Sequence, residues 1–353
     1  MKSITKRKLV ILMLLLLAVL FAGCEANNFQ ISSNEKVNPK EGELLVHFID
    51  VGQGDSIFIQ FPNGETSLID GGTRDSGKKV TAYLNGLGIQ RIDYLVATHP
   101  HEDHIGGLPQ IVKNYEIGKI YMPKKTANTK IFEELLTEIK NKGLGITIAK
   151  GGDKIVEDDN LKYLVLAPNG DNYEEINEYS IVTKLTYKNT SFIFTGDAEK
   201  VSEDEMLTKG YDLSANVLKI GHHGGRTSTS QPFLDEVNPE YGVISLGKDN
   251  SYGHPHKETL ERLKKKGITI LRTDEMGNIV ISSDGDNIKV LNQTVQGKNE
   301  IKDGQNYYIG NKNTKIYHSK DCSHLPKPEN QVIFNSKEEA ESNGYTPHEN
   351  CIK

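Results

Sequence analysis

Three histidines and two acidic residues lie within six consecutive positions of this chain. Residues 99–104 read His-Pro-His-Glu-Asp-His and directly follow the apolar residues 94–97. Neutral imidazole nitrogen and carboxylate oxygen are ligands that Zn²⁺, Mn²⁺ and Fe²⁺ accept in proteins. So dense a cluster is not typical of a solvated polar loop, and it predicts a metal centre.

Further polar clusters follow other predicted strands. Residues 195–197 read Thr-Gly-Asp, residues 221–225 read Gly-His-His-Gly-Gly, and residues 252–256 read Tyr-Gly-His-Pro-His. In layered α/β sheets, ligands gather outside the carboxyl ends of the strands. We therefore expect these clusters to meet residues 99–104 at one edge of the fold.

The chemistry that these residue types suit is hydrolysis by a metal-activated hydroxide. Two divalent ions held roughly 3.5 to 4 Å apart lower the pKa of a shared water and polarise the substrate, so no protein nucleophile is required. A nearby acid must protonate the leaving group, and His223 and His254 are candidates; a role in orienting a ligand is equally open for each. We expect Asp50 and Asp55 to support the ligands and His47, in mid-strand, to be packed in the interior.

Strand-type apolar runs alternate with helical periodicity along the chain, which predicts an α/β sandwich. The predicted strands are 45–51, 56–61, 67–70, 93–97, 161–167, 181–187, 191–194, 217–220, 241–246, 268–271, 278–281 and 288–291. The predicted helices are 78–87, 132–142, 199–209 and 258–266.

The composition divides the chain into five parts. We predict a signal peptide at 1–23, a polar tether at 24–43, a catalytic domain at 44–292, a linker at 293–306 and a small metal-binding module at 307–353. The 36% apolar and 25% charged residues are an ordinary balance for globular domains.

The first 23 residues have the character of a secretion signal. Basic residues precede an apolar run from 9 to 22, which is shorter than the roughly 20 residues that span a bilayer as a helix. Cys24 follows the small pair Ala22-Gly23, as in a bacterial lipobox. We expect an exported protein that is anchored to the outer face of the cell membrane by lipid on Cys24; a conventional signal peptide cut nearby is the alternative.

The average charge of the chain does not favour a polyanionic partner. Removal of residues 1–23 takes four positive charges from a formal net charge of −6 and leaves about −10. Any role on nucleic acid must then be local, carried by metal ions and a few basic residues. Candidates near the motifs are Lys219, Arg226, Lys248 and Lys257.

The C-terminal module contains two closely spaced ligand pairs. His318 is four positions before Cys322, and His348 is three positions before Cys351. Short spacings let each pair close on one ion, which predicts a structural zinc site. A disulfide between the two cysteines, natural in an exported protein, is the alternative.

The ordered motifs resemble those of the metallo-β-lactamase fold superfamily, and within it the hydrolase domain of ComEC-like bacterial competence proteins. The resemblance covers roughly residues 44–292 and implies an αββα sandwich. It rests on Asp50-Val51-Gly52-Gln53-Gly54-Asp55-Ser56, on His99 to His104 with Gly106-Gly107, on Thr195-Gly196-Asp197, on Gly221-His222-His223-Gly224 and on Tyr252-Gly253-His254-Pro255-His256.

The resemblance also implies a ligand set for two divalent ions, Zn²⁺ or Mn²⁺. The implied ligands are His99 and His101 for one ion, Asp103, His104 and His222 for the other, and Asp197 as a bridge. Asp103 and Asp197 are thus the predicted catalytic carboxylates, with His223 and His254 as the candidate proton donors.

One family position is different in this chain. Residues 105–196 contain no histidine, although most members of the superfamily have one there. Residues 177–180 read Asn-Glu-Tyr-Ser and match the ComEC-like branch, in which a serine replaces it. Loss of one imidazole disfavours tight binding of Zn²⁺ at the first site, so Mn²⁺ binding or occupancy by a single ion remains an alternative. The loss also argues against a β-lactamase, glyoxalase or lactonase.

Residues 308–351 resemble the small metal-binding domain of the Ada DNA-repair protein. Two of the four cysteine positions are histidines here. The resemblance therefore implies zinc binding, while the altered ligands argue against phosphotriester repair.

Together these resemblances imply an extracytoplasmic metal-dependent hydrolase of phosphodiesters, with DNA or nucleotides as substrate and a role in DNA uptake. Two alternatives remain. One is a cell-surface hydrolase of a small ester, lactone or amide, and the other is a non-catalytic lipoprotein that binds DNA or wall polymer.

Overall fold

The computed structural model describes residues 39–291, 308–320, 322–327, 330–334, 336–342, 344–349 and 351–352. The predicted signal peptide, the predicted lipidation site Cys24 and the predicted linker at 293–306 lie outside the described residues. Within them, no helix combines the length and the apolar character that crossing a membrane requires.

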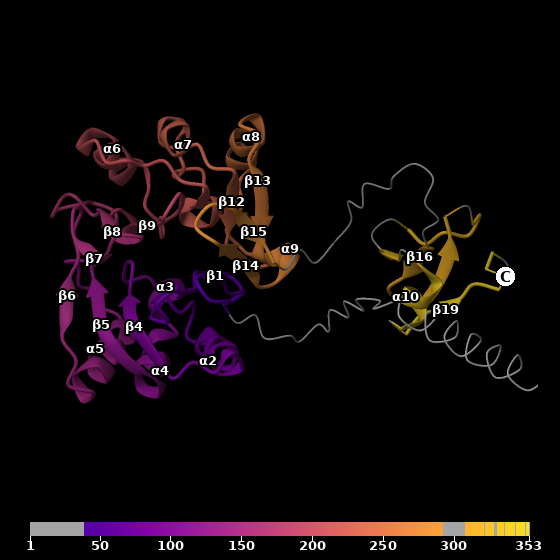
Figure 1. The fold of residues 1–353 in the computed structure, drawn as a ribbon, viewed down its shortest axis with the longest axis horizontal. Helices are drawn as coiled ribbons and strands as arrows, with labels where there is room; N and C mark the ends of the chain where they lie inside the picture. The colour runs from indigo at the N-terminus through magenta and orange to yellow at the C-terminus, as the bar shows by residue number, and fades with distance from the viewer. Residues whose placement is uncertain are drawn as a thin grey trace, which may run out of the picture. The chain divides into compact units, whose positions relative to one another are not determined.

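Residues 39–291 form two β-sheets (Figure 1). In the eight-stranded sheet the order is β15 (Ile288–Val290), β14 (Ile279–Ser283), β1 (Leu44–Phe48), β2 (Ile57–Gln60), β3 (Thr66–Ile69), β4 (Arg91–Val96), β5 (Glu116–Met122) and β6 (Ile146–Ile148). In the seven-stranded sheet it is β13 (Thr269–Arg272), β12 (Tyr241–Ile244), β11 (Val217–Lys219), β10 (Thr190–Phe194), β9 (Val182–Tyr187), β8 (Leu161–Ala167) and β7 (Lys154–Glu157).

Two of the strands that precede the polar clusters, β4 and β11, run parallel to both of their neighbours. β4 pairs in parallel with β3 and β5, and β11 pairs in parallel with β10 and β12. Their carboxyl ends therefore open at one edge of each sheet, where the predicted ligands follow.

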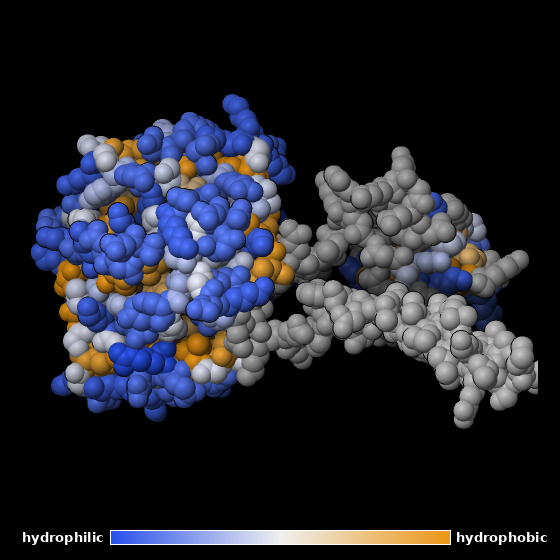
Figure 2. Space-filling view, viewed as in Figure 1, coloured by the Kyte–Doolittle hydropathy of each residue, from blue (hydrophilic) through white to orange (hydrophobic). Residues whose placement is uncertain are grey.

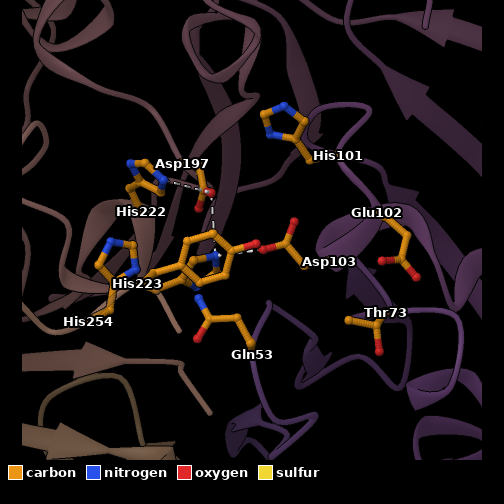
Figure 3. A pocket seen from close by; sticks show the side chains of 10 residues that line it. Gln53, Thr73, His101, Glu102, Asp103, Asp197, His222, His223 and His254 are labelled. Atoms are coloured by element: carbon orange, nitrogen blue, oxygen red, sulfur yellow. Dashed lines mark ion pairs between the residues drawn. The ribbon is translucent and has the colours of Figure 1, made fainter. Parts of the chain in front are cut away.

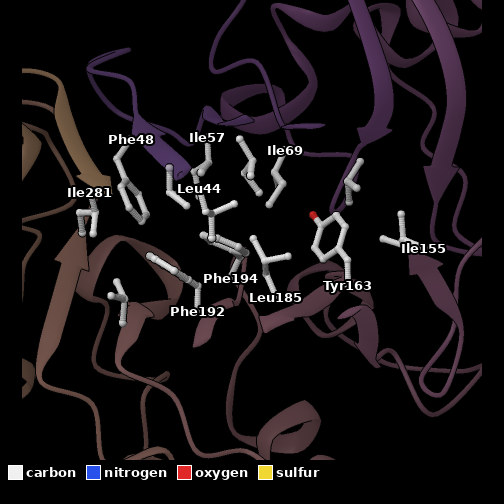
Figure 4. Packing of buried hydrophobic residues seen from close by; sticks show 14 of the residues in the cluster. Leu44, Phe48, Ile57, Ile69, Ile155, Tyr163, Leu185, Phe192, Phe194 and Ile281 are labelled. Atoms are coloured by element: carbon white, nitrogen blue, oxygen red, sulfur yellow. The ribbon is translucent and has the colours of Figure 1, made fainter. Parts of the chain in front are cut away.

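The space between the sheets is filled by apolar side chains from both of them (Figure 4). Phe48 of β1 and Phe194 of β10 lie with ring centroids 6.2 Å apart. Burial of such a side chain contributes roughly 1.5 to 3 kcal/mol, so this layer holds the sheets together. Other members of the layer are Leu44, Ile57, Ile69, Tyr163, Leu185 and Phe192.

Helices cover the outer face of each sheet and complete an αββα sandwich, as predicted. The first sheet packs with α2 (Ser76–Leu87), α4 (Leu108–Asn114) and α5 (Lys130–Asn141), and the second with α6 (Lys200–Lys209), α7 (Gln231–Val237) and α8 (Lys257–Lys265). Short helical segments are α3 (Glu102–Ile105), η1 (Ile176–Tyr179), η2 (Gly221–Gly224) and α9 (Thr273–Met276).

Helix α5 illustrates how the sequence specifies this outer layer. The Thr129 hydroxyl accepts a hydrogen bond from the backbone N–H of Phe132 and caps the helix. Ile131, Leu135 and Ile139, at spacings of four residues, are buried on one side. The opposite side is polar, in keeping with the hydrophilic surface that dominates the face in Figure 2.

The C-terminal module is built around a four-stranded sheet. Its elements are β16 (Tyr308–Asn311), β17 (Ile316–Ser319), β18 (Gln331–Phe334), α10 (Lys337–Ser342) and β19 (Thr346–Pro347), with strand order β18-β16-β17-β19. Its own small core contains Tyr317, Phe334, Ala340 and Tyr345.

Candidate metal centre

The polar clusters that follow β4, β10 and β11 meet at a cleft of about 480 Å³ (Figure 3). The cluster 252–256 follows β12 and also contributes to it. The lining side chains are Gln53, Thr73, His101, Glu102, Asp103, Asp197, His222, His223, Tyr252 and His254.

Asp197 lies at the centre of this arrangement and is buried. Its Oδ2 is 3.2 Å from Nε2 of His104, 3.4 Å from Nε2 of His223 and 3.9 Å from Nε2 of His99. Oδ2 of Asp103 is 3.3 Å from Nε2 of His223. One ligand atom each from Asp103, His104, Asp197 and His223 thus lies within 4.8 Å of the others.

Hydrogen bonds behind the imidazoles turn their lone pairs toward Asp197. Nδ1–H of His104 donates to Oδ2 of Asp70 at 2.8 Å, and Nδ1–H of His223 donates to the carbonyl of Ser245 at 2.9 Å. A neutral imidazole that donates through Nδ1 presents a free lone pair at Nε2. Both rings are therefore oriented as metal ligands.

Three buried atoms at this point lack a hydrogen-bond partner among the described residues. They are Nε2 of His104, Nε2 of His223 and Oδ1 of Asp197. Buried polar atoms are normally satisfied, and atoms that converge without a donor between them suit a cation. The residues present therefore fit a divalent metal ion.

The pKa shifts of these groups also indicate that the cluster requires positive charge. Burial opposes protonation of His104 and His223, yet the carboxylates of Asp197 and its neighbours raise the pKa of both imidazoles well above the ordinary value. For Asp197, burial favours the neutral acid, but His104 and His223 hold its pKa well below the usual range. Either protons or a metal cation must neutralise this cluster.

His99 and His101 form the other side of the centre. Nε2 of His99 is 3.0 Å from Nδ1 of His101. Ser180, in the segment predicted to replace a histidine, lies 3.3 Å from Nδ1 of His99 and accepts from the backbone N–H of Asp197 at 3.1 Å. Ser180 thus supports two predicted ligands from behind, and the described residues offer only two imidazoles here.

The structure places His223 nearer to the carboxylates than His222. Nε2 of His222 is 4.0 Å from Oδ2 of Asp197, its side chain is 27% exposed, and its Nδ1–H donates to Glu199 at 2.9 Å. His223, expected as a proton donor, is buried beside Asp103 and Asp197. His223 approaches both carboxylates more closely and therefore joins the candidate ligands, while the assignment of His222 as a ligand stays a prediction.

His254 lies on the cleft wall. Its ring centroid is 5.3 Å from that of His222 and 6.3 Å from that of His223. Burial and the two neighbouring imidazoles lower its pKa to about 4. The role of His254 as the acid stays a prediction, because it requires a proton that this environment disfavours.

Asp55 supports the centre from the β1–β2 loop, as expected. Its Oδ2 is 2.9 Å from Nζ of Lys219, and its Oδ1 is 3.5 Å from Nδ1 of His223. At the preceding position only glycine fits, because a Cβ on Gly54 would lie 2.1 Å from the carbonyl oxygen of Asp103. Lys219 is fully buried, so the expectation that it contacts a substrate phosphate is wrong.

Two other expectations concern residues near this loop. His47 is buried as expected, and it bonds to Tyr83 through Nδ1 and to Gln60 through Nε2. Asp50 instead closes its own loop by accepting from the backbone N–H of Gly52 at 3.0 Å.

Sequence reasoning gave no role to Asp70 or Glu199. Asp70 directly follows β3, has a positive φ of 58° and accepts from both the backbone N–H and the hydroxyl of Thr98. Its position before a glycine pair at a strand end was the available signal. Glu199 bonds to His222 and Asn177, and no pattern in the sequence indicates that contact.

The C-terminal module brings its four predicted ligands together. The distances from Cys322 Sγ to Nδ1 of His318 and His348 are 3.5 and 3.7 Å, and those from Cys351 Sγ are 3.8 and 3.3 Å. Tetrahedral zinc with ordinary Zn–S and Zn–N bonds requires about 3.6 Å between such atoms. Both cysteines are free thiols, so the alternative of a disulfide is not observed.

Known protein families match both the catalytic domain and the C-terminal module of this chain. Residues 49–248 match the family model of the metallo-beta-lactamase superfamily, and residues 291–352 match the model of the metal binding domain of Ada. ComE operon protein 3 of Bacillus subtilis is 34% identical over 256 residues, which cover 68% of this chain and 33% of that protein.

The chain is also similar to a second curated protein and to a solved structure. Competence protein ComA of Neisseria gonorrhoeae is 32% identical over 243 residues, which cover 67% of this chain and 32% of that protein. The chain thus spans about a third of the length of the curated relatives it matches. The solved fold protein YhfI of Bacillus subtilis is 11% identical, with a TM-score of 0.47 over 68% of this chain and 100% of that one. On the match to residues 49–248, the chain belongs to the metallo-beta-lactamase superfamily.

Proposed function

We propose that this protein is a metal-dependent phosphodiesterase that acts on nucleic acid or nucleotides outside the cytoplasm, anchored by lipid on Cys24. The observation that carries the proposal is the convergence of His104, His223 and Asp197 with unsatisfied buried atoms at one point. Such a site needs a cation, and it opens to a cleft large enough for a substrate.

The candidate ligands form two groups that share Asp197. Asp103, His104 and His223 would hold one divalent ion, His99 and His101 would hold a second, and Asp197 would contribute to both. Divalent ions at such a site lower the pKa of water and polarise a phosphoryl oxygen.

We assign the leaving-group proton to the imidazolium form of His222, which carries a proton at Nε2 as well as at Nδ1. Its Nδ1–H is held by Glu199, and its Nε2 faces the cleft at 4.0 Å from Asp197. A histidine that is oriented by a carboxylate and partly exposed is suited to proton transfer.

The relatives supply the choice of substrate class. One matched relative, ComA of Neisseria gonorrhoeae, is named a competence protein. As part of the proposal, we take DNA or nucleotides as the substrate class of this chain. The small zinc module, with its Cys₂His₂ ligands, is assigned a structural role.

The test uses the protein without residues 1–23, loaded with Mn²⁺ or Zn²⁺. Single-stranded DNA, duplex DNA, bis(p-nitrophenyl) phosphate and a panel of lactones are assayed with the wild type and with D197A. D204A, which removes the same charge from the exposed surface of α6, is the matched control.

Hydrolysis of the diesters by the wild type and by D204A, together with its loss in D197A, supports the proposal. Turnover of lactones alone replaces it with the small-ester alternative. Absence of any turnover with either metal favours a binding protein and overturns it.

A further inference from the structure

A series of rings extends from the metal centre to the outer rim of the cleft. The ring centroid of His254 lies 6.3 Å from that of His223 and 4.8 Å from that of His256. Tyr252 is 64% exposed and stacks on His254, with centroids 5.7 Å apart and planes inclined by 23°. We call Arg226, Tyr252, His254 and His256 the rim cluster.

Two hydrogen-bond donors face each other at the outer end of the rim cluster. The backbone N–H of Arg226 donates to Nδ1 of His256 at 3.1 Å, so the proton of the neutral ring resides on Nε2. That Nε2 lies 3.1 Å from Nη2 of the Arg226 guanidinium, which can only donate. Two donors at this distance require a shared acceptor, and an anionic oxygen suits both.

The described part of the chain does not supply this acceptor. Among its carboxylates, none lies within 4.0 Å of the nitrogens of Arg226. Glu258, in the first turn of α8, faces Arg226 and His256 from farther away and is bonded to its own backbone N–H. The donor pair is therefore available to a ligand.

The cleft is asymmetric with respect to an anionic chain. In Figure 3, His222 and His254 lie on one side of Asp197, and Glu102 lies on the other. The Glu102 carboxylate is exposed and accepts from the backbone N–H of Arg74 at 3.0 Å. A second phosphate would be repelled on the Glu102 side and attracted on the Arg226 side.

We propose that the rim cluster binds single-stranded nucleic acid beside the scissile phosphodiester. Arg226 and His256 bind a neighbouring backbone phosphate, and Tyr252 stacks on an unpaired base. An aromatic platform next to a basic group is the arrangement that binds single strands without sequence preference, because every base has a face to stack. This inference rests on the proposed phosphodiesterase function and names its substrate class.

The test compares R226Q and Y252L with the wild type, all as metal-loaded protein. Binding is measured by the fluorescence anisotropy of a labelled phosphorothioate oligothymidylate, which resists cleavage, at several salt concentrations. Hydrolysis is measured on a single-stranded oligonucleotide and on bis(p-nitrophenyl) phosphate. R91Q, which removes one charge at the opposite end of β4, is the control for net charge.

We expect each rim variant to weaken oligothymidylate binding roughly tenfold or more, as loss of a phosphate contact or a base stack does. R226Q lowers the salt slope of the affinity by about 0.7, whereas Y252L and R91Q leave the slope unchanged. In both rim variants, oligonucleotide hydrolysis falls at least about tenfold more than hydrolysis of the small diester.

Unchanged oligothymidylate affinity in R226Q and Y252L overturns the inference, as does an equal loss on both substrates. A wild type that hydrolyses neither substrate overturns the phosphodiesterase proposal alone, because the binding experiment still decides whether the rim cluster holds a single strand. A duplex that binds as tightly as the single strand also contradicts the inference.

Discussion

Nε2 of His223 lies 3.4 Å from Oδ2 of Asp197, and both side chains are almost wholly buried. A hydrogen bond from Nδ1 of the same ring to the Ser245 carbonyl leaves this Nε2 without its own proton when the ring is neutral. A lone pair that faces a buried carboxylate is unfavourable unless a cation lies between them. The relationship therefore requires a proton or a metal cation at this end of the cleft, and a divalent ion fits the ligand types present.

The first prediction separates the two adjacent histidines. H223A removes a direct ligand and should reduce Mn²⁺ affinity by more than the roughly 10- to 100-fold that loss of an outer partner costs. H222A removes a group held by Glu199 and should reduce Mn²⁺ affinity by less than about 100-fold while lowering turnover. Calorimetric titration with Mn²⁺ measures both, and a larger loss in H222A than in H223A would contradict the ligand assignment.

The second prediction concerns the residue that orients His104. In D70N an amide can occupy the place of the carboxylate oxygen that accepts from Nδ1 of His104, which would favour the wrong tautomer. We expect Mn²⁺ affinity to fall by about 10- to 100-fold, with little change in secondary structure. D50N is the matched control, because the Asp50 carboxylate bonds to the backbone of its own loop. This variant should bind Mn²⁺ normally.

The third prediction concerns the buried pair of Lys219 and Asp55. K219M leaves the Asp55 carboxylate buried without its cation, which should cost about 3 to 5 kcal/mol of unfolding free energy. The double variant D55N/K219M should recover most of that loss. K184M, whose partner Asp212 is 77% exposed, should lose much less, because water can solvate the carboxylate.

Chemical denaturation measures all three variants of that experiment against the wild type. If K219M is no less stable than K184M, the Asp55 carboxylate is not the buried charge that the structure indicates.

The fourth prediction is a pH dependence of stability. Burial lowers the pKa of His47 from 6.5 to about 4, although the bond to Gln60 opposes this shift. The unfolded chain therefore binds a proton between pH 6.5 and pH 4 that the folded chain does not, so stability falls as the pH falls through this window. The loss amounts to roughly 3 kcal/mol at most.

The variant H47Q should lack this contribution. Its unfolding free energy should fall less than that of the wild type between pH 7 and pH 4.5 in denaturant titrations. Equal losses in the two proteins would show that His47 is not the responsible group.

The sequence predicted the parts of the fold that carry a strong local pattern. The strand at Leu161–Ala167 and most of the helix at Lys130–Asn141 were found because alternation and helical spacing are visible in a single segment. The strand Ile146–Ile148 was missed: its three residues are exposed at the edge of the sheet, so no burial pattern marks it.

The site was predictable to the extent that its ligands are close in sequence. Residues 99–104 are a self-contained cluster, whereas the choice between His222 and His223 depends on contacts from distant segments. Both histidines have a positive φ, of 48° and 53°, and Ser245 and Glu199 decide which ring points inward. Neighbours in the chain with similar chemistry could not be separated by their order alone.

The central claim is most directly tested by anomalous diffraction from crystals of the full protein grown with Mn²⁺. The account predicts a manganese peak bound by Asp103, His104, Asp197 and His223, and a second between His99, His101 and Asp197. A peak bound by His222 and Glu199 instead, or no peak within reach of Asp197 at saturating Mn²⁺, would contradict it.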